Sequence, residues 1–334
     1  MQDTVSHTVR GAAEICKGDI HVMALSEREV ERLLDPRALL DGLAEGFRAL
    51  ARGDVQSPPR PEIKVPGKGF LLPMPAWQEG LPITVKMVAV FEHNLERGLP
   101  NHLALITLFD PRTGMPICVM DGTFITGIRT AGSAVLSVRE LARKDASIAT
   151  VIGAGVQGRE HVKLLPLVRD FDEIRVCSLV HEDAVRLARI EPRARAVEDV
   201  EAAVRDADVV CLASHSYRPV IEPGWARPGT HVSSVGFAPP AGELPVELAK
   251  AGHLFVEDKA AFEVPPVGCN ELQGLDPASG TALGDMLLGR AAGRRSEKEV
   301  TVYKAMGLAM EDMVAATIVY ERARRERAGA SFVL

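Results

Sequence analysis

The chain has 334 residues, about twice the usual length of one domain, so we expect two domains. Hydrophobic residues make up 46% and charged residues 25%, which excludes a disordered or low-complexity chain. The formal net charge of -6 argues against sequence-independent binding to nucleic acid or to an anionic membrane. Small-molecule chemistry remains the open class of function.

The sequence carries no signal for membrane insertion, export or disulfide formation. No apolar run approaches the ~18 residues of a spanning helix, and residues 1–20 lack the features of a secretory signal and are expected to form a tail. The five cysteines are odd in number and show no C-x-x-C or other metal spacing, which is typical of buried thiols in a reducing compartment. We therefore expect a soluble, cytoplasmic protein without a metal site.

The first half is predicted to begin with two helices and to continue as a sheet. Ser26 and Glu29 form a capping box, Asp35 precedes a proline at the first position of the second helix, and Gly53 ends that helix. From Arg60 onward, short β-rich runs broken by Gly and Pro predict a mixed or antiparallel sheet. The expected strands are residues 62–65, 70–72, 84–91, 103–109 and 116–120.

The pattern changes after Gly122 to a long helix ending near Arg143, followed by strands and helices in alternation. This alternation predicts an α/β region with a largely parallel sheet. The expected strands are residues 148–152, 174–177, 209–213, 231–235 and 253–256. Residues 307–327 form an amphipathic helix that could pack back on the first half.

A glycine-rich loop joins the strand at residues 148–152 to the helix that follows. In Gly153-Ala154-Gly155-Val156-Gln157-Gly158, the first glycine would make a tight turn and the second would let backbone approach a pyrophosphate. Gly158 would let helix and strand pack closely, with the helix N-terminus facing the anion. The alternative is an ordinary strand-to-helix turn, but the context favours a dinucleotide-binding loop.

Ser178 stands about 20 residues after the loop, where a carboxylate would accept the ribose hydroxyls of NAD. No Arg follows it to bind a 2'-phosphate, so the sequence does not choose between NAD and NADP. The missing carboxylate removes the repulsion that would exclude the phosphate.

Three basic residues, Arg60, Lys86 and Arg129, are candidates for binding an anionic substrate. Lys86 lies in an apolar strand, where burial is costly without a partner; the alternative is an edge strand whose ammonium reaches water. Considered individually, Arg60 and Arg129 are expected to be solvated surface residues. Together, the three cations would suit a substrate with a carboxylate. Asn101 and His102 follow a turn, where they could reach a cofactor or simply cap the turn.

The sequence resembles the ornithine cyclodeaminase and mu-crystallin family over about residues 22–320. The matching strings, in chain order, are Met74-Pro75-Ala76, Val85-Lys86 leading to Asn94, Gly98 to His102, Phe109-Asp110 with Thr113-Gly114, Asp121-Gly122 through Arg129-Thr130-Ala131, Val151 to Gln157, and Gly307-Leu308-Ala309 with Glu311-Asp312.

The resemblance implies a homodimer in which a Rossmann dinucleotide-binding domain is inserted in an α+β substrate and dimerisation domain. The corresponding boundaries are residues 123–298 for the inserted domain and 21–122 plus 299–334 for the other. It further implies that Arg60, Lys86 and Arg129 hold the substrate carboxylate, with Lys86 near the reacting carbon and Arg129 also near the cofactor. The residues implied to contact cofactor are Gly155, Val156, Gln157, Asn101 and Lys304.

One position departs from the pattern of ornithine cyclodeaminases. Those enzymes carry an Asp for the distal amine shortly after the Val-Gly that corresponds to Val235-Gly236, and this chain has Ala238 there. Alanine cannot bind an ammonium or accept a proton, and Glu243 cannot be assumed to replace the Asp because family members commonly carry both.

The leading interpretation is an NAD(P)-dependent imine (ketimine) reductase or amino-acid dehydrogenase, acting at the carbon beside the carboxylate of an imino, oxo or amino acid. Lys86 would assist proton movement at nitrogen or at an activated water. The alternatives are a cyclodeaminase with an altered distal pocket and a cofactor-loaded binding protein without turnover.

Overall fold

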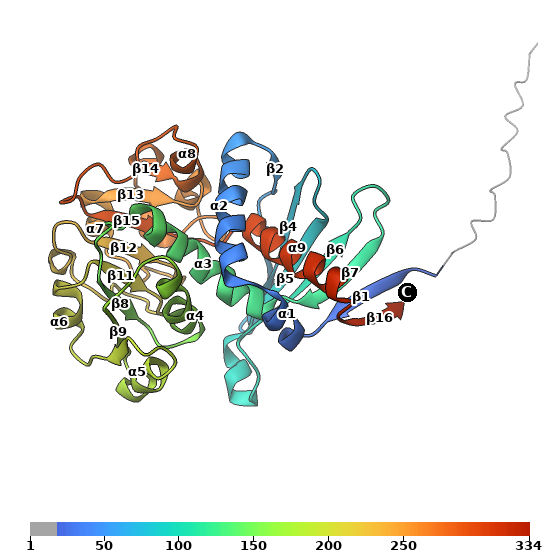
Figure 1. Cartoon of the computed structure of the whole chain (residues 1–334), viewed down its shortest axis with the longest axis horizontal. Helices are drawn as coiled ribbons and strands as arrows, with labels where there is room; N and C mark the ends of the chain where they lie inside the picture. Colours follow the sequence, from blue (N-terminus) through green and yellow to red (C-terminus); the bar gives the residue numbers. More distant parts are fainter. Residues whose placement is uncertain (1–18) are drawn as a thin grey trace, which may run out of the picture.

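The computed structural model describes residues 19–334, so the tail expected over residues 1–20 falls almost entirely outside the described part. Two sheets lie side by side, with helices α2 (Pro36–Arg52) and α3 (Thr123–Leu141) between them (Figure 1). The all-parallel sheet is at the left of the figure and the mixed sheet at the right. The chain thus has the α/β architecture that the sequence predicts.

Strand β1 (His21–Leu25) precedes the two predicted helices, α1 (Glu27–Leu33) and α2. Ser26 and Glu29 form the predicted capping box, and Asp35 Oδ1 accepts a hydrogen bond from the backbone of Ala38 at 2.8 Å. Gly53 ends α2 with a φ of 82°, a left-handed conformation that glycine adopts without steric cost. Both predicted helices are confirmed.

The mixed sheet has the order β16-β1-β7-β6-β5-β4-β2, with β3 also paired to β4. Strands β1 and β7 are parallel and the remaining pairs are antiparallel. Its other strands are β2 (Val55–Gln56), β3 (Ile63–Val65), β4 (Gly69–Gln78), β5 (Ile83–Val90), β6 (His102–Phe109), β7 (Pro116–Asp121) and β16 (Ala330–Val333), with the 3-10 helix η1 (Glu92–Arg97) between β5 and β6.

Strand β4 is longer than the expected residues 70–72 because two prolines do not interrupt it. Pro73 and Pro75 pair with β5, but they lie between the stretch that pairs with β3 and the stretch that pairs with β2. A proline is tolerated in a strand where its missing N–H leaves no ladder bond unmade.

One face of the mixed sheet is covered by helices and forms the core of this half. Helices α1, α3 and α9 (Ala309–Glu326) pack on it, as the sequence suggested for the last helix. Glycines in α2 bring α9 close, because a Cβ on Gly46 would lie 2.3 Å from Met310 Sδ and one on Gly42 2.8 Å from Val314 Cγ1. Every second residue of the covered strands points into this core, and Val88 of β5 and Ile106 of β6 are buried there.

The parallel sheet has the order β10-β9-β8-β11-β12-β15-β13-β14 and confirms all five predicted strands. Its strands are β8 (Ile148–Ile152), β9 (Glu173–Cys177), β10 (Ala194–Ala196), β11 (Val209–Leu212), β12 (His231–Ser234), β13 (His253–Val256), β14 (Gly280–Ala282) and β15 (Thr301–Lys304). Its helices are α4 (Val156–Leu164), α5 (His181–Ala188), α6 (Val200–Arg205), α7 (Val246–Ala251) and α8 (Leu283–Leu287).

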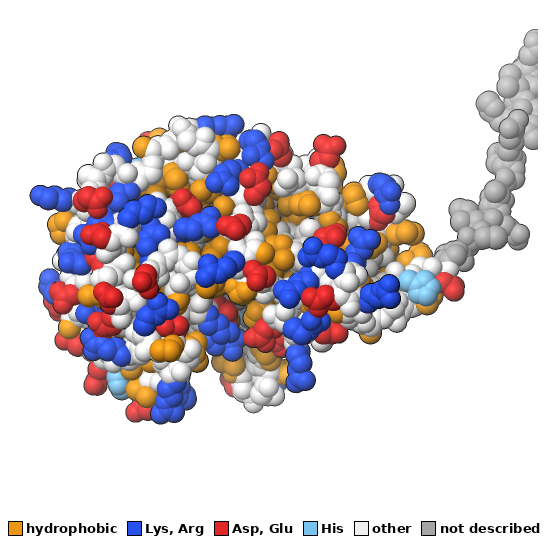
Figure 2. Space-filling view, in the orientation of Figure 1, with side chains coloured by type: hydrophobic (Ala, Val, Ile, Leu, Met, Phe, Trp, Pro, Cys, Tyr) orange, Lys and Arg blue, Asp and Glu red, His pale blue; other side chains and the backbone are white. Residues whose placement is uncertain are grey.

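Strand β15 enters this sheet between β12 and β13, so the sheet extends beyond residue 298. The domain boundaries expected from the sequence otherwise remain a prediction. On the face shown in Figure 2, basic and acidic side chains are interspersed, and the surface is indented between the parallel-sheet half and the projecting segment that carries η1. Within residues 19–334, no helix has the length and apolarity that a bilayer crossing requires.

Candidate active site

The glycine loop connects β8 to α4, where the sequence places a dinucleotide. Gly153 has a φ of 119°, and a Cβ there would lie 2.2 Å from the carbonyl oxygen of Ala213. A Cβ on Gly158 would lie 1.9 Å from the carbonyl oxygen of Gly153, so these two glycines are required by close packing of backbone. A Cβ on Gly155 would meet no atom within 4 Å, which leaves open space beside the loop at the start of α4.

Two neighbours of Gly155 begin helix α4 beside this open space. Val156 is 60% exposed, and Gln157 follows it in the first turn. A strand, a glycine turn and a helix N-terminus with backbone N–H groups directed outward form a phosphate cradle. The loop therefore fits a dinucleotide, although the cofactor roles of its individual residues remain predictions.

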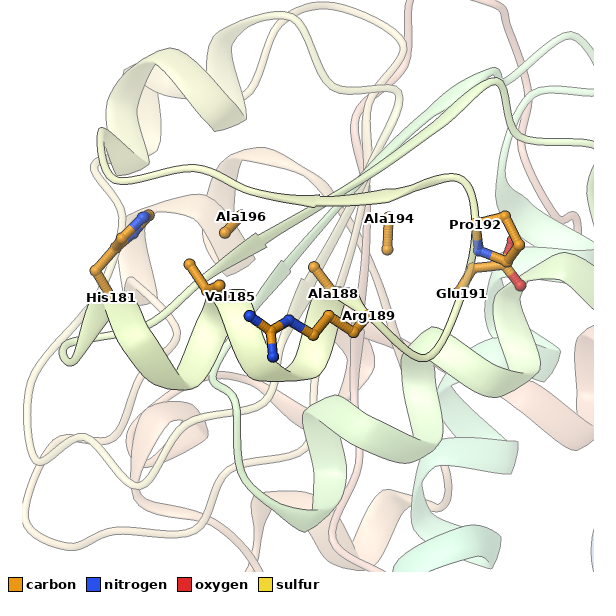
Figure 3. A pocket seen from close by; sticks show the side chains of 8 residues that line it. All are labelled: His181, Val185, Ala188, Arg189, Glu191, Pro192, Ala194 and Ala196. Carbon is orange, nitrogen blue, oxygen red and sulfur yellow. The ribbon is translucent and has the colours of Figure 1, made fainter.

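Ser178 directly follows β9 and is half-buried, as expected for a residue that would face the adenosine ribose. The neighbouring depression, with a volume of about 510 Å³, lies between α5 and β10 at the outer edge of the parallel sheet. Figure 3 shows His181 at one end, Pro192 at the other and small side chains between them. None of the predicted site residues lines it, so this depression is separate from the candidate site.

Lys86 lies in β5, which pairs with β4 on one side and β6 on the other. The edge-strand interpretation is therefore wrong, because Lys86 points into the helix-covered face and its side chain is fully buried. Its Nζ atom lies 2.7 Å from Asp312 Oδ2 in the first turn of α9. Burial, followed by repulsion from Arg129, lowers the pKa of Lys86 to about 8.

Arg129 lies in α3 and is buried rather than solvated, because two carboxylates of α9 pair with it. Its Nη1 donates to Glu311 Oε2 at 2.8 Å and its Nε donates to Asp312 Oδ1 at 3.0 Å. Burial alone would lower the pKa of Arg129, but Asp312, Glu311 and Glu257 together raise it, so the guanidinium stays charged. Its Nη2 group makes no hydrogen bond to the described residues and is available to an anionic ligand.

Arg60 also departs from the solvated expectation and bridges the two halves of the chain. Its Nε donates to the carbonyl oxygen of Pro266 at 2.8 Å, and its Nη1 donates to that of Gly307 at 3.0 Å. Burial, followed by repulsion from Arg129, lowers its pKa. Most of the N–H groups of Arg60 already donate to backbone carbonyls. To bind a substrate carboxylate, as predicted, Arg60 must give up some of these hydrogen bonds.

The loop between β15 and α9 brings the three cations together. Glu257, at the end of β13, accepts hydrogen bonds from the backbone N–H groups of Met306 and Gly307, each at 2.8 Å. Gly307 has a φ of 75°, and a Cβ there would lie 2.3 Å from Arg129 Nη1. Glycine thus lets the loop pass directly beside the guanidinium, within reach of Arg60.

His102, at the start of β6, lies near this cluster, while Asn101 is exposed beside it. Burial, and then repulsion from Lys86 and Arg129, lowers the pKa of His102 to about 4, so its imidazole is neutral at pH 7. The backbone carbonyl of Asn101 accepts a hydrogen bond from the N–H of Phe91 at 2.8 Å. The predicted contact of Asn101 with the cofactor stays a prediction.

Lys304 is placed at the carboxyl end of β15, with its side chain fully buried. Its three donors are engaged: Nζ lies 3.1 Å from Ser234 Oγ, 2.6 Å from the carbonyl oxygen of Gly236 and 2.8 Å from Glu271 Oε1. The ammonium thus holds the loop after β12. A direct cofactor contact, as the family resemblance implies, would require one of these bonds to exchange.

Glu243 does not take the place of the Asp that ornithine cyclodeaminases use. Its carboxylate accepts hydrogen bonds from the backbone and hydroxyl of Ser214 at 2.7 Å each, from Gly236 N at 2.7 Å and from Ser234 Oγ at 3.0 Å. It is 1% exposed, and Ala238 is buried as well. Both carboxylate oxygens are occupied in holding loops, so neither is left to pair with a distal ammonium.

Three carboxylates of the cluster, Glu257, Glu311 and Asp312, received no role from the sequence. The sequence indicated such a role only weakly for Glu311 and Asp312, because acidic residues in the first turn of a helix are also favoured by the helix dipole. Only the fold shows that this turn points at Lys86 and Arg129.

The fold and site define a dinucleotide-binding α/β protein in which a buried cationic cluster lies beneath the mixed sheet. Comparison with known proteins makes this specific, since residues 20–327 match the profile of the ornithine cyclodeaminase/mu-crystallin family. The chain belongs to this family.

Among its relatives, the ketimine reductase mu-crystallin of Mus musculus is 32% identical over 305 residues, covering 89% of this chain and 96% of that protein. The structure of Thermococcus litoralis Δ1-pyrroline-2-carboxylate reductase with NADH and L-proline superposes with a TM-score of 0.86 at 31% identity, covering 92% and 99% of the chains. An archaeal alanine dehydrogenase dimer with bound NAD gives a TM-score of 0.83 at 29% identity, covering 93% and 99%.

Proposed function

We propose that this chain is an NAD(P)-dependent oxidoreductase that acts on the CH–NH or CH–NH2 group beside a carboxylate, as an imine reductase or an amino-acid dehydrogenase. The observation that carries the proposal is the convergence of Lys86 and Arg129 on Asp312, with Arg60 hydrogen-bonded to the loop that precedes Asp312. The activities named for the relatives, ketimine reduction, pyrroline-2-carboxylate reduction and alanine dehydrogenation, share this reaction type.

In this proposal, the open space beside Gly155 receives the pyrophosphate and Ser178 faces the adenosine ribose. When bound, the nicotinamide supplies a hydride to the substrate carbon or accepts one from it. NAD and NADP both remain compatible with Ser178, since the serine neither pairs with the ribose as a carboxylate would nor repels a 2'-phosphate.

The chain's own residues bind the substrate and move the proton. Arg129 offers its Nη2 group to the carboxylate, and Arg60 contributes the remaining positive charge. Lys86, with its pKa near 8, holds a proton at neutral pH and can transfer it to the substrate nitrogen. Reduction of an imine consumes one hydride at carbon and one proton at nitrogen, so this transfer balances the reaction.

We further propose that the protein is a homodimer formed through the face of the mixed sheet that helices leave open. Neighbouring positions on that face, Pro73, Met87 and Leu105, are apolar and in register across β4, β5 and β6. Leu105 is 49% exposed and Leu103, two residues before it, is 40% exposed. An apolar sheet face of this kind is typical of a protein interface, and a second copy would cover it.

A cytoplasmic location completes the proposal. The four cysteines that lie within the described residues are free and buried, as is usual in a reducing compartment.

The reaction is tested with purified protein, NADH or NADPH, and a panel of small substrates. We expect oxidation of the reduced nicotinamide, followed by absorbance, with cyclic ketimine carboxylates or with 2-oxo acids plus ammonia. The matched control is the same ketimine with its carboxylate converted to an amide, which should react far more slowly. Ammonia release from L-ornithine without net redox change would indicate a cyclodeaminase, and binding without turnover across the panel would indicate a binding protein.

A further inference from the structure

The buried cluster contains two carboxyl groups, Glu257 and Glu311, whose charges the proposed mechanism does not use. Both residues are almost completely buried, and their side chains lie within hydrogen-bonding reach of each other. Two ionised carboxylates do not remain in contact in a buried site, because their repulsion is not screened by water. One proton must therefore be held between them.

The hydrogen-bond partners show where that proton lies. Glu257 Oε2 accepts from Met306 N and Gly307 N, and its Oε1 accepts from Ser133 Oγ at 3.4 Å. Glu311 Oε2 accepts from Arg129 Nη1 and from Leu308 N, whereas Glu311 Oε1 is buried and has no partner among the described residues. A protonated carboxyl group is a donor, and Glu311 Oε1 is the one oxygen of the pair that accepts no hydrogen bond from the described residues, so the hydrogen is best placed there.

We infer that Glu311 is held as the neutral acid, donating a hydrogen bond from Oε1 to Glu257, so that the cluster carries one positive charge in excess. Arg60, Lys86 and Arg129 contribute three positive charges, and Asp312 and Glu257 contribute two negative ones. His102, facing the cluster from β6, is neutral, as is Tyr303 of β15. The carboxylate of a substrate then brings the site to neutrality without either Glu257 or Glu311 taking up a proton.

The inference rests on the proposed function for the nature of the ligand, but the proton itself does not depend on it. Burial, and then the neighbouring Glu257, raises the pKa of Glu311 well above its ordinary value, in agreement with the geometry. Glu311 is a positioning residue: as a neutral acid it still binds Arg129 through Oε2, but it leaves the charge of Arg129 for the substrate.

The protonation of Glu311 is tested by infrared spectroscopy of the full-length protein at pH 7.5, where ordinary carboxyl groups are ionised. We expect one carbonyl band of a protonated carboxylic acid in the wild type, shifted in D2O. The band should disappear in Glu311→Gln and persist in the matched control Glu321→Gln, which alters a half-exposed carboxylate of the same helix. Absence of the band from the wild type, or its persistence in folded Glu311→Gln, would overturn the inference.

A second measurement uses only the wild-type protein with bound NAD. Binding of cyclopentanecarboxylate, a carboxylate without an amine, is followed by calorimetry in buffers of different ionisation enthalpy at pH 7.5. We expect uptake of well under half a proton, which is the fraction that Lys86 lacks at this pH, because Glu311 already holds its proton. Uptake of about one proton would show that the pair was ionised beforehand and would contradict the inference. If this ligand fails to bind, the proposed substrate class fails, while the infrared band still decides where the proton is.

Discussion

At the residue scale, the chemistry of the site depends on Lys86, whose ammonium is fully buried beside Asp312 and Arg129. Burial of a charge is tolerated only when it is paired, and here Asp312 compensates two cations at once. Because burial and Arg129 lower its pKa to about 8, Lys86 changes its protonation state much more readily than an exposed lysine. This combination suits a residue that both attracts an anion and transfers a proton.

Replacing Lys86 separates these two roles. We expect Lys86→Ala to lower turnover by about 10²- to 10⁴-fold, as for loss of a positioned acid or base, while cofactor affinity stays nearly unchanged. Lys86→Arg keeps the charge but not the proton transfer, so part of the substrate binding should survive without turnover. Steady-state kinetics and fluorescence titration of the reduced cofactor measure the two effects. Equal turnover in all three proteins would remove Lys86 from the mechanism.

The lowered pKa of Lys86 predicts how the reaction depends on pH. In the reductive direction Lys86 must be protonated, so kcat/KM should fall as the pH rises through about 8. In the oxidative direction the neutral amine is required, and kcat/KM should rise through the same range. The profiles are measured in both directions at fixed ionic strength. An inflection near the ordinary lysine pKa of 10.5, or one that moves the same way in both directions, would argue against this assignment.

Ser178 is expected to set the tolerance for the cofactor's 2'-phosphate. Ser178→Asp would place a carboxylate at the end of β9, where it accepts ribose hydroxyls and repels a phosphate. We expect the ratio of kcat/KM for NADH to that for NADPH to rise, by tenfold or more if the repulsion exceeds about 1.4 kcal/mol. An unchanged ratio would mean that another residue faces the ribose.

At the element scale, the turn between β15 and α9 places the cationic cluster. Glu257 holds the N–H groups of this turn, and the carbonyl of Gly307 holds Arg60. The first turn of α9 then directs Glu311 and Asp312 at the guanidinium of Arg129. The whole arrangement depends on the close approach of Gly307 to Arg129.

Gly307→Ala tests this dependence, with Gly289→Ala as a matched control. Both glycines have a φ near 75°, so both substitutions carry a backbone strain of about 1 kcal/mol. A Cβ on Gly307 would lie 2.3 Å from Arg129 Nη1, whereas one on Gly289 meets nothing within 4 Å. We expect Gly289→Ala to lose thermal stability through backbone strain alone and Gly307→Ala to lose more, with a tenfold or larger rise in the KM for the carboxylate substrate only in Gly307→Ala. Equal KM values in the two variants would contradict this prediction.

Much of this arrangement of elements could be predicted from local patterns in the sequence. Capping residues such as Ser26 and Asp35 act within one turn of helix, and the glycine loop lies between adjacent elements, so each is readable along the chain. Six short strands were not predicted: β1, β2, β10, β14, β15 and β16. They are two to five residues long, and their places in the sheets depend on partners elsewhere in the chain.

The site was only partly predictable for the same reason. Lys86 and Arg129 were recognised as candidates, but their pairing with Asp312 joins residues that are more than 180 positions apart in the chain. The sequence could not distinguish an edge strand from a central one for Lys86, because both show the same alternation of residue types. The engagement of Lys304 and Glu243 by neighbouring loops likewise appears only once the strand order is known.

At the scale of the whole molecule, the two faces of the mixed sheet have different roles. Its helix-covered face carries Lys86 among the core residues, and its open face presents apolar side chains in register on β4, β5 and β6. The parallel sheet provides the cofactor loop, and Arg60 and the loop after β15 connect the two halves. A dimer formed through the open face would leave the catalytic cluster on the opposite side of the sheet.

The proposed dimer is tested by introducing a charge at the centre of the open face. Leu105→Glu should give a monomer, because an unpaired carboxylate is costly to bury in an apolar interface. Ile190→Glu is the control, since Ile190 is similarly exposed but lies beyond α5 in the other half. Light scattering coupled to size-exclusion chromatography gives the masses. A wild-type mass of one chain, or a dimeric Leu105→Glu protein, would reject the interface.

The central claim is that hydride passes between the nicotinamide and the carbon beside the substrate carboxylate. The most direct test reacts a cyclic ketimine carboxylate with NADH or NADPH deuterated at the transferring position, and locates the label in the product by mass spectrometry and NMR. We predict one deuterium on the carbon that bears the carboxylate, in a single configuration. A product that carries no deuterium at that carbon, or the absence of any reduction with both ketimine carboxylates and 2-oxo acids plus ammonia, would contradict the account.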